Sequence, residues 1–238
     1  MKELLLTMAT ATRTTSIAIT RGETLLAEVS IDPPGTQSEI ILATVDRILD
    51  DLGLSVDGMD FFAVVHGPGA FTGLRVGVAT IKGFALATGK PVVGVSSLQT
   101  LATQVPDYPG NVYALIDARK HEVYAGFFQW RGGLPMLVGS ERVVDPELLL
   151  DEIDGDALFV GDGAAAYRTL IVRKLGERAR FAPWPANTVR ASSAALLALD
   201  KIRTSGGVSP EKLNPVYIRP SDAEINMPQT GAEGGIEG

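Results

Sequence analysis

The chain has 238 residues, of which 45% are apolar, and its formal net charge is −7. Cysteine is absent, which excludes disulfides and thiolate metal sites, and no apolar run reaches the length needed to span a membrane. The negative charge argues against a protein that binds nucleic acid by itself, because neutralised phosphates supply most of that affinity. The N-terminus turns polar too soon for a signal peptide, so we expect a cytosolic protein with a sizeable core.

The first part of the chain alternates strands and helices. Three short strands precede an amphipathic helix, which has apolar side chains on one face and acidic ones opposite. A buried strand, a glycine-rich turn, a long apolar helix, a strand and a short helix follow. The predicted strands are 3–9, 14–20, 23–30, 60–65 and 91–95, and the predicted helices are 37–52, 71–88 and 97–104.

The segment Pro106–Gly110 is the best candidate for a domain boundary, because the same element order begins again after it. Three strands, a helix, a strand and a helix therefore occur twice. We predict one lobe over residues 1–106, a second over 107–220, and a disordered tail over 221–238, which is rich in Gly and Glu. The second set comprises strands at 112–117, 122–130, 136–143 and 157–160 and helices after Asp145-Pro146, at 164–175 and at 192–203.

A glycine turn, Gly67-Pro68-Gly69, opens the apolar helix. The spacing of its glycines departs from the dinucleotide-binding pattern, and no acidic residue lies about twenty positions later to hold a ribose. A Rossmann-type nucleotide site is therefore excluded. A structural turn is the default interpretation, and phosphate capture by the backbone amides of the helix start stays open as an alternative.

The helix predicted over 71–88 has two different faces. One carries large apolar side chains, and the other is small and uncharged. Glycine in a helix interior costs about 1 kcal/mol relative to alanine, so the glycines of this helix indicate a close approach by another element. That element belongs either to the same chain or to a partner subunit, and we favour the partner. The small face consists of Thr72, Gly73, Val76, Ala79, Thr80, Gly83 and Ala87.

The block Gly67–Gly77, its continuation Val78–Gly83 and the stretch Asp117–Tyr124 together resemble the TsaB family of bacterial tRNA threonylcarbamoyladenosine biosynthesis subunits. Members show G-P-G-S-F-T-G-L-R-[IV]-G in the first block, where this chain has Ala70 in place of the serine. The resemblance covers about residues 3–220. It implies an α/β fold of two ribonuclease H-like lobes, as in the actin, sugar kinase and heat-shock chaperone superfamily.

The same resemblance implies a role without catalysis. TsaB is a non-catalytic paralogue of the TsaD transferase, pairs with it through its first two long helices, and is joined by the TsaE ATPase. Together they modify the adenosine at position 37 of tRNA, so this chain would meet tRNA only through the complex and would hold no cofactor or metal. In isolation it could form a homodimer through the same surface. The expected partner-binding residues are Ile41, Val45 and Ile48 of the first helix and Thr72, Gly73, Val76, Ala79, Thr80 and Gly83 of the second.

Three departures from related proteins bear on function. TsaD-like enzymes place two metal-binding histidines in a V-N-H-L-E-A-H stretch, where this chain has Ser97 and Leu101. A hydroxyl and an isobutyl group cannot replace two imidazoles on a transition metal. Ala9 stands where the TsaB family usually has an aspartate. In kinase-like relatives that carboxylate helps to hold magnesium and phosphate, so its loss weakens a residual ATPase function. Gln37 replaces a family histidine, and its amide cannot titrate.

Two rival functions remain at this stage. A kinase-like ATPase or nucleotide-binding protein would need carboxylates at the cleft between lobes, and only Asp117 and Asp162 are suitably placed. A metallopeptidase would need a bound metal, which the missing histidine pair opposes.

Overall fold

The computed structural model describes residues 2–219, so the tail predicted for 221–238 lies outside the described residues. The first sheet has five strands in the order β3-β2-β1-β4-β5. Strand β1 pairs antiparallel with β2 and parallel with β4. The strands are β1 (Leu4–Ala9), β2 (Thr15–Arg21), β3 (Thr24–Ile31), β4 (Phe61–Gly67) and β5 (Val92–Ser96).

The second sheet repeats this order. Its strands run β11-β10-β6-β7-β8, and β9 also pairs with β7, so β6 and β7 correspond to β1 and β2 of the first sheet. The repeat confirms the predicted fold of two ribonuclease H-like lobes. The predicted third strand is split in two, and the three-residue β11 was not predicted. The strands are β6 (Asn111–Arg119), β7 (Glu122–Arg131), β8 (Leu134–Leu137), β9 (Arg142–Val144), β10 (Ala157–Val160) and β11 (Ala179–Phe181).

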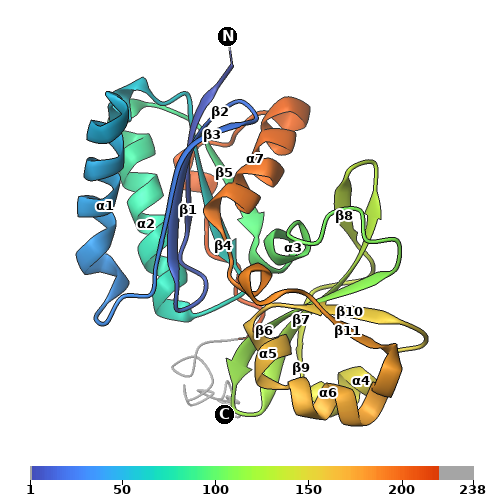
Figure 1. The fold of residues 1–238 in the computed structure, drawn as a ribbon. Helices are drawn as coiled ribbons and strands as arrows, with labels where there is room; N and C mark the ends of the chain where they lie inside the picture. The colour runs from blue at the N-terminus through green and yellow to red at the C-terminus, as the bar shows by residue number, and fades with distance from the viewer. Residues whose placement is uncertain (1, 220–238) are drawn as a thin grey trace, which may run out of the picture.

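Helices α1 and α2 lie side by side on one face of the first sheet, and α3 and α7 cover the other face (Figure 1). Helices α4, α5 and α6 pack on the second sheet, where the predicted helix 164–175 is interrupted at Tyr167. The helices are α1 (Gln37–Leu52), α2 (Phe71–Thr88), α3 (Ser97–Ala102), α4 (Pro146–Asp151), α5 (Asp162–Ala166), α6 (Arg168–Leu175) and α7 (Ala191–Ser205). Short 3₁₀ turns occur at Val56–Gly58, Gly176–Arg178, Trp184–Asn187 and Pro210–Lys212.

The position of helix α7 (Ala191–Ser205) does not follow the two-lobe division predicted from the sequence. The boundary after residue 106 separates the strands of the two sheets, but α7 packs on β1, β2, β4 and β5 of the first sheet. Its buried alanines and leucines join a core cluster that also contains Leu5, Val95, Val112 and Phe128. One continuous core therefore connects the lobes, because the chain returns to the first sheet after the second is complete.

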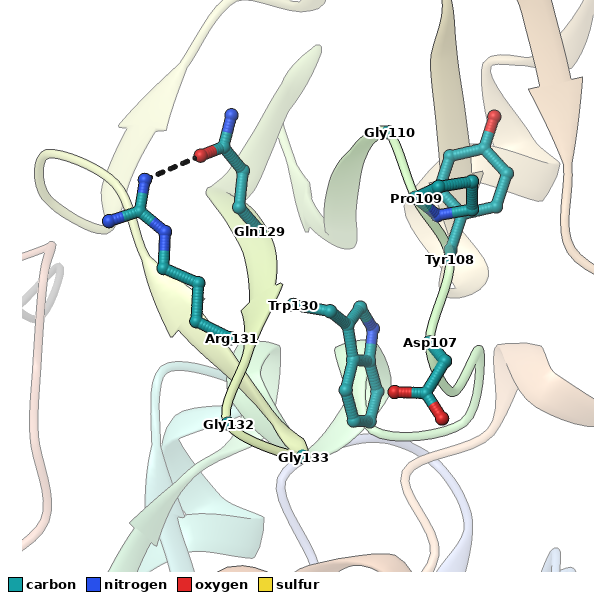
Figure 2. Close-up of a pocket in the computed structure, with 9 residues that line it drawn as sticks. All are labelled: Asp107, Tyr108, Pro109, Gly110, Gln129, Trp130, Arg131, Gly132 and Gly133. Carbon is teal, nitrogen blue, oxygen red and sulfur yellow. Dashed lines mark hydrogen bonds between the residues drawn. The ribbon is translucent and has the colours of Figure 1, made fainter.

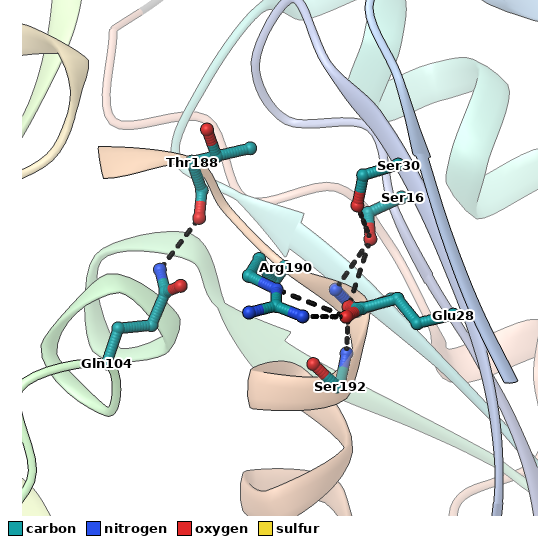
Figure 3. A network of polar contacts seen from close by, with 8 residues as sticks. Ser16, Glu28, Ser30, Gln104, Thr188, Arg190 and Ser192 are labelled. Carbon is teal, nitrogen blue, oxygen red and sulfur yellow. Dashed lines mark hydrogen bonds and ion pairs between the residues drawn. The ribbon is translucent and has the colours of Figure 1, made fainter. Parts of the chain in front are cut away.

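A carboxylate from β3 holds the start of α7 (Figure 3). Glu28 Oε1 accepts a hydrogen bond of 2.9 Å from the backbone N–H of Ser192, and Glu28 Oε2 accepts one of 3.1 Å from Arg190 Nε. Helix α7 has no side-chain N-cap of its own, and a negative group near the first turn stabilises the exposed helix N–H groups. Burial opposes ionisation of Glu28, but the hydrogen bonds from Arg190 and Ser192 outweigh it and hold the pKa of Glu28 below its usual value.

Within residues 2–219, no helix combines the length and the apolar character required to cross a bilayer.

Candidate partner-binding surface

The first turns of α2 press against this chain's own β1–β2 turn. A Cβ added to Gly73 would lie 2.1 Å from the carbonyl oxygen of Thr10, and one added to Gly77 would lie 2.2 Å from the Thr10 hydroxyl. That hydroxyl donates a hydrogen bond of 2.7 Å to the Gly73 carbonyl. Gly73 was expected to face a partner, and this was wrong: the close approach that it permits is made inside the monomer.

The α1 residues assigned to the partner surface are also in the core. Ile41, Val45 and Ile48 are 1%, 2% and 4% exposed and belong to the cluster between α1, α2 and the first sheet. Their spacing of four and three residues places them on one side of the helix, which is the side that packs on the sheet. A partner cannot reach them while the fold is intact, so the prediction is corrected for these three residues.

The remaining predicted residues stay accessible on α2. Thr72, Ala79 and Gly83 are exposed, whereas Val76 and Thr80 are half-buried. Within residues 2–219, apart from its neighbours in the helix, no heavy atom lies within 4 Å of a Cβ built on Gly83. The small side of α2 is therefore open between Thr72 and Gly83, and the described chain does not cover it.

Two exposed leucines that were not predicted enlarge this surface. Leu42 of α1 is 60% exposed and Leu86 of α2 is 58% exposed. The spacing of Leu86, seven residues after Ala79, was a visible signal in the sequence, whereas Leu42 was assigned to the core side of α1. We define the outer face of α1 and α2 as Leu42, Thr72, Val76, Ala79, Thr80, Gly83 and Leu86.

A cleft of about 310 Å³ lies between the lobes, and the two carboxylates singled out from the sequence line it. Asp162 Oδ1 accepts a hydrogen bond of 3.1 Å from the Asp117 backbone N–H, and Asp117 pairs with Arg119 at 3.3 Å. Burial raises the pKa of Asp162, and the nearby Asp117 carboxylate acts in the same direction. Ala9, where kinase-like relatives have a third carboxylate, is fully buried at the end of β1.

The positions of the missing histidines are closed by packing. Ser97 and Leu101 are both fully buried, and the Ser97 hydroxyl donates a hydrogen bond to the Pro68 carbonyl. Gln37 uses its amide to donate to the Thr12 carbonyl at 2.8 Å, which ties α1 to the β1–β2 turn. Within residues 2–219, no group of three or more His, Cys, Asp or Glu side chains is placed to hold a metal.

The segment 213–219, here called the C-terminal strap, connects the two lobes. On the first lobe, the Val216 N–H donates to the His66 carbonyl at 2.7 Å, and Lys82 Nζ donates to the Leu213 carbonyl at 3.0 Å. On the second lobe, Arg219 donates to the Ala118 carbonyl at 2.8 Å and pairs with the Glu122 carboxylate. The strap thus crosses the cleft beside the start of α2.

A second cavity, of about 360 Å³, lies between the inter-lobe linker and the end of β7 (Figure 2). The Trp130 indole stands between Asp107 and the Gly132-Gly133 turn, while Arg131 turns away and donates to Gln129 at 2.9 Å. The indole N–H of Trp130 is buried and has no hydrogen-bond partner within residues 2–219. Nothing in this lining forms a recognisable catalytic or metal-binding group.

Comparisons with known proteins agree with this architecture. The chain matches the family model described as TsaD, tRNA N6-adenosine threonylcarbamoyltransferase, over residues 36–227. It is 35% identical to the tRNA threonylcarbamoyladenosine biosynthesis protein TsaB of Haemophilus influenzae, over 72% of this chain and 77% of that protein. It is 30% identical to the TsaB of Escherichia coli, over 94% of this chain and 98% of that protein.

Solved structures give the same result. YeaZ from Pseudomonas aeruginosa is 31% identical and superposes with a TM-score of 0.78, over 90% of this chain and 99% of that one. Component A of the (R)-2-hydroxyglutaryl-CoA dehydratase from Acidaminococcus fermentans is 13% identical with a TM-score of 0.51, over 86% of this chain and 100% of that one, and shares the fold alone. These bacterial relatives match this chain at 30% and 35% identity over most of its length, and the chain therefore belongs to the TsaB family of tRNA threonylcarbamoyladenosine biosynthesis proteins.

Proposed function

We propose that this chain is a non-catalytic, cytoplasmic subunit of the complex that makes threonylcarbamoyladenosine at position 37 of tRNA. It binds and activates a TsaD-type transferase through the outer face of α1 and α2, and a TsaE-type ATPase joins the pair. The match to the TsaD family model supports a paralogue as partner, because related folds carry corresponding helices. The net charge of −7 supports contact with tRNA through the complex rather than through this chain alone.

The outer face itself carries the proposal. It combines exposed leucines with small side chains on two adjacent helices, and the described chain leaves Gly83 open to solvent. Exposed apolar patches on folded proteins mark interaction sites, and interface cores are depleted of charge. Small residues such as Ala79 and Gly83 allow a foreign helix to approach closely. In the absence of the transferase, the same patch would favour a homodimer.

The absence of catalysis is supported by two substitutions. Ser97 and Leu101 fill the histidine positions of TsaD-like enzymes with buried side chains that offer no imidazole. Ala9 offers no carboxylate at the end of β1, where a kinase-like site would hold magnesium and phosphate. We therefore expect the isolated chain to transfer no threonylcarbamoyl group and to stimulate the transferase when added to it.

A charge placed on the outer face tests the proposal. Gly83→Arg has room in the monomer, so it should leave the fold intact and abolish co-purification with the transferase and stimulation of tRNA modification. Leu148→Arg is the matched control, because Leu148 is 62% exposed on α4 of the second lobe. The control should bind and stimulate normally. A complex that tolerates Gly83→Arg would contradict the proposed surface.

A further inference from the structure

Arg75 is an exposed side chain at the border of the outer face, yet aromatic groups hold it in one orientation. Its guanidinium carbon lies 3.9 Å from the centroid of the Phe71 ring. Its Nε donates a hydrogen bond of 3.0 Å to the hydroxyl of Tyr217, which belongs to the C-terminal strap. The Phe71 and Tyr217 rings are themselves in contact, with centroids 4.9 Å apart. Stacking on a ring and a fixed Nε together restrict the guanidinium plane.

No carboxylate of the described chain neutralises this guanidinium. No Asp or Glu occurs between Phe61 and Pro106, and no ion pair joins Arg75 to an acidic residue within residues 2–219. Two other arginines near the ends of the chain differ in this respect: Arg190 pairs with Glu28, and Arg219 pairs with Glu122. The Nε of Arg75 is used on Tyr217, so its two terminal nitrogens present a fork that matches a carboxylate.

We propose that Arg75 is the receptor for an Asp or Glu side chain of the partner that packs on the outer face of α1 and α2. This inference rests on the proposed function and specifies one contact of that interface. Ala79 and Leu86 follow Arg75 by four and eleven residues, so all three lie on one flank of α2. Arg75 is about one helical turn from Ala79, so a partner helix that packs on Ala79 could place a carboxylate beside Arg75. Because the aromatic contacts already fix the guanidinium, little side-chain entropy is lost on binding.

Charge favours a partner carboxylate over a tRNA phosphate. The neighbouring helix α1 exposes Glu39, Asp46, Asp50 and Asp51, and the whole chain carries a net charge of −7. A polyanionic backbone would be repelled by this net negative charge, whereas a single carboxylate needs only one oriented guanidinium.

The test measures the dissociation constant of the complex between the full chain and the transferase. Arg75→Gln should weaken binding about 10- to 100-fold, the usual range for hydrogen bonds to a charged group. Tyr217→Phe keeps the ring but removes the hydroxyl that orients Nε, and it should weaken binding about two- to tenfold. The matched control is Arg47→Gln, since Arg47 is an exposed arginine of α1 that already has Asp51 at 3.9 Å, and its affinity should stay within about twofold.

Charge reversal separates recognition from a merely structural role of Arg75. Arg75→Glu should abolish binding, and replacing one particular Asp or Glu of the transferase by Lys should restore it. Circular dichroism and thermal unfolding of each variant alone report whether the strap is disturbed.

Three results would overturn the inference. The first is that Arg75→Gln binds the transferase as tightly as Arg47→Gln does. The second is that no Lys replacement in the transferase restores binding of Arg75→Glu. The third is that Arg75→Gln weakens only the affinity of the assembled complex for tRNA. If Gly83→Arg still abolishes the complex in those cases, the proposed function stands and only the role of Arg75 falls. If neither variant affects binding, the proposed surface fails.

Discussion

Adding one methyl group at two glycines of α2 should change stability in opposite directions. Gly73 and Gly83 lie in the same helix, and neither has a positive φ angle, so both can accept alanine as far as the backbone is concerned. Their surroundings differ. A Cβ at Gly73 would lie 2.1 Å from the Thr10 carbonyl oxygen, whereas a Cβ at Gly83 would meet nothing within 4 Å.

The expected magnitudes follow from these surroundings. Alanine gains about 1 kcal/mol over glycine in a helix interior, and Gly83→Ala should keep most of this gain. At Gly73 the atom in the way is backbone, so α2 or the β1–β2 turn must move before ordinary contact is restored. Overpacking costs about 1–3 kcal/mol, and loss of the hydrogen bond from Thr10 Oγ1 to the Gly73 carbonyl costs about 1 kcal/mol more. After the gain of about 1 kcal/mol in helix propensity is subtracted, Gly73→Ala should lower the free energy of unfolding by about 1–3 kcal/mol.

Thermal and urea unfolding of the two variants and the parent chain provide the assay. For a chain of this size, about 1 kcal/mol shifts Tm by about 2–4 °C, so Gly73→Ala should unfold about 2–12 °C lower and Gly83→Ala about 2–4 °C higher. An unchanged or increased stability of Gly73→Ala would refute the packing argument. Equal destabilisation of both variants would contradict the overpacking expected at Gly73 and the gain in helix propensity expected at Gly83.

Three further changes have defined outcomes. Ile41→Ala should lower the free energy of unfolding by about 2–5 kcal/mol in urea denaturation, whereas Leu42→Ala should change it by less than about 0.5 kcal/mol and weaken the complex instead. Because the folded-state pKa of Glu28 is lowered, its ion pair stabilises the fold above the unfolded-state pKa of about 4.3, and this contribution is lost as pH falls through the folded-state value. The stability difference between the parent and Glu28→Gln should therefore be full above about pH 4.3 and shrink as the pH falls below that value, and a constant difference would contradict that role. Sedimentation velocity of the isolated chain should show a homodimer that Gly83→Arg dissociates, while an unchanged dimer would place self-association elsewhere.

The sequence alone determined the element order. The predicted helix over 71–88 has the bounds of α2, and the first three predicted strands agree with β1, β2 and β3 to within about one residue at each end. These elements follow from local signals: apolar periodicity, turn glycines and the Pro33-Pro34-Gly35 break.

Only the tertiary structure decided what packs against each face of a helix. Gly73 and Gly83 look alike in sequence, but Thr10, sixty-three residues before Gly73, packs against Gly73, whereas no other element of residues 2–219 packs against Gly83. Periodicity gives the angle of a side chain around its helix and does not say whether a sheet, a distant turn or solvent lies in that direction. The placement of α7 on the first sheet has the same cause, because burial is a property of the whole folded chain and is not encoded by neighbours in sequence.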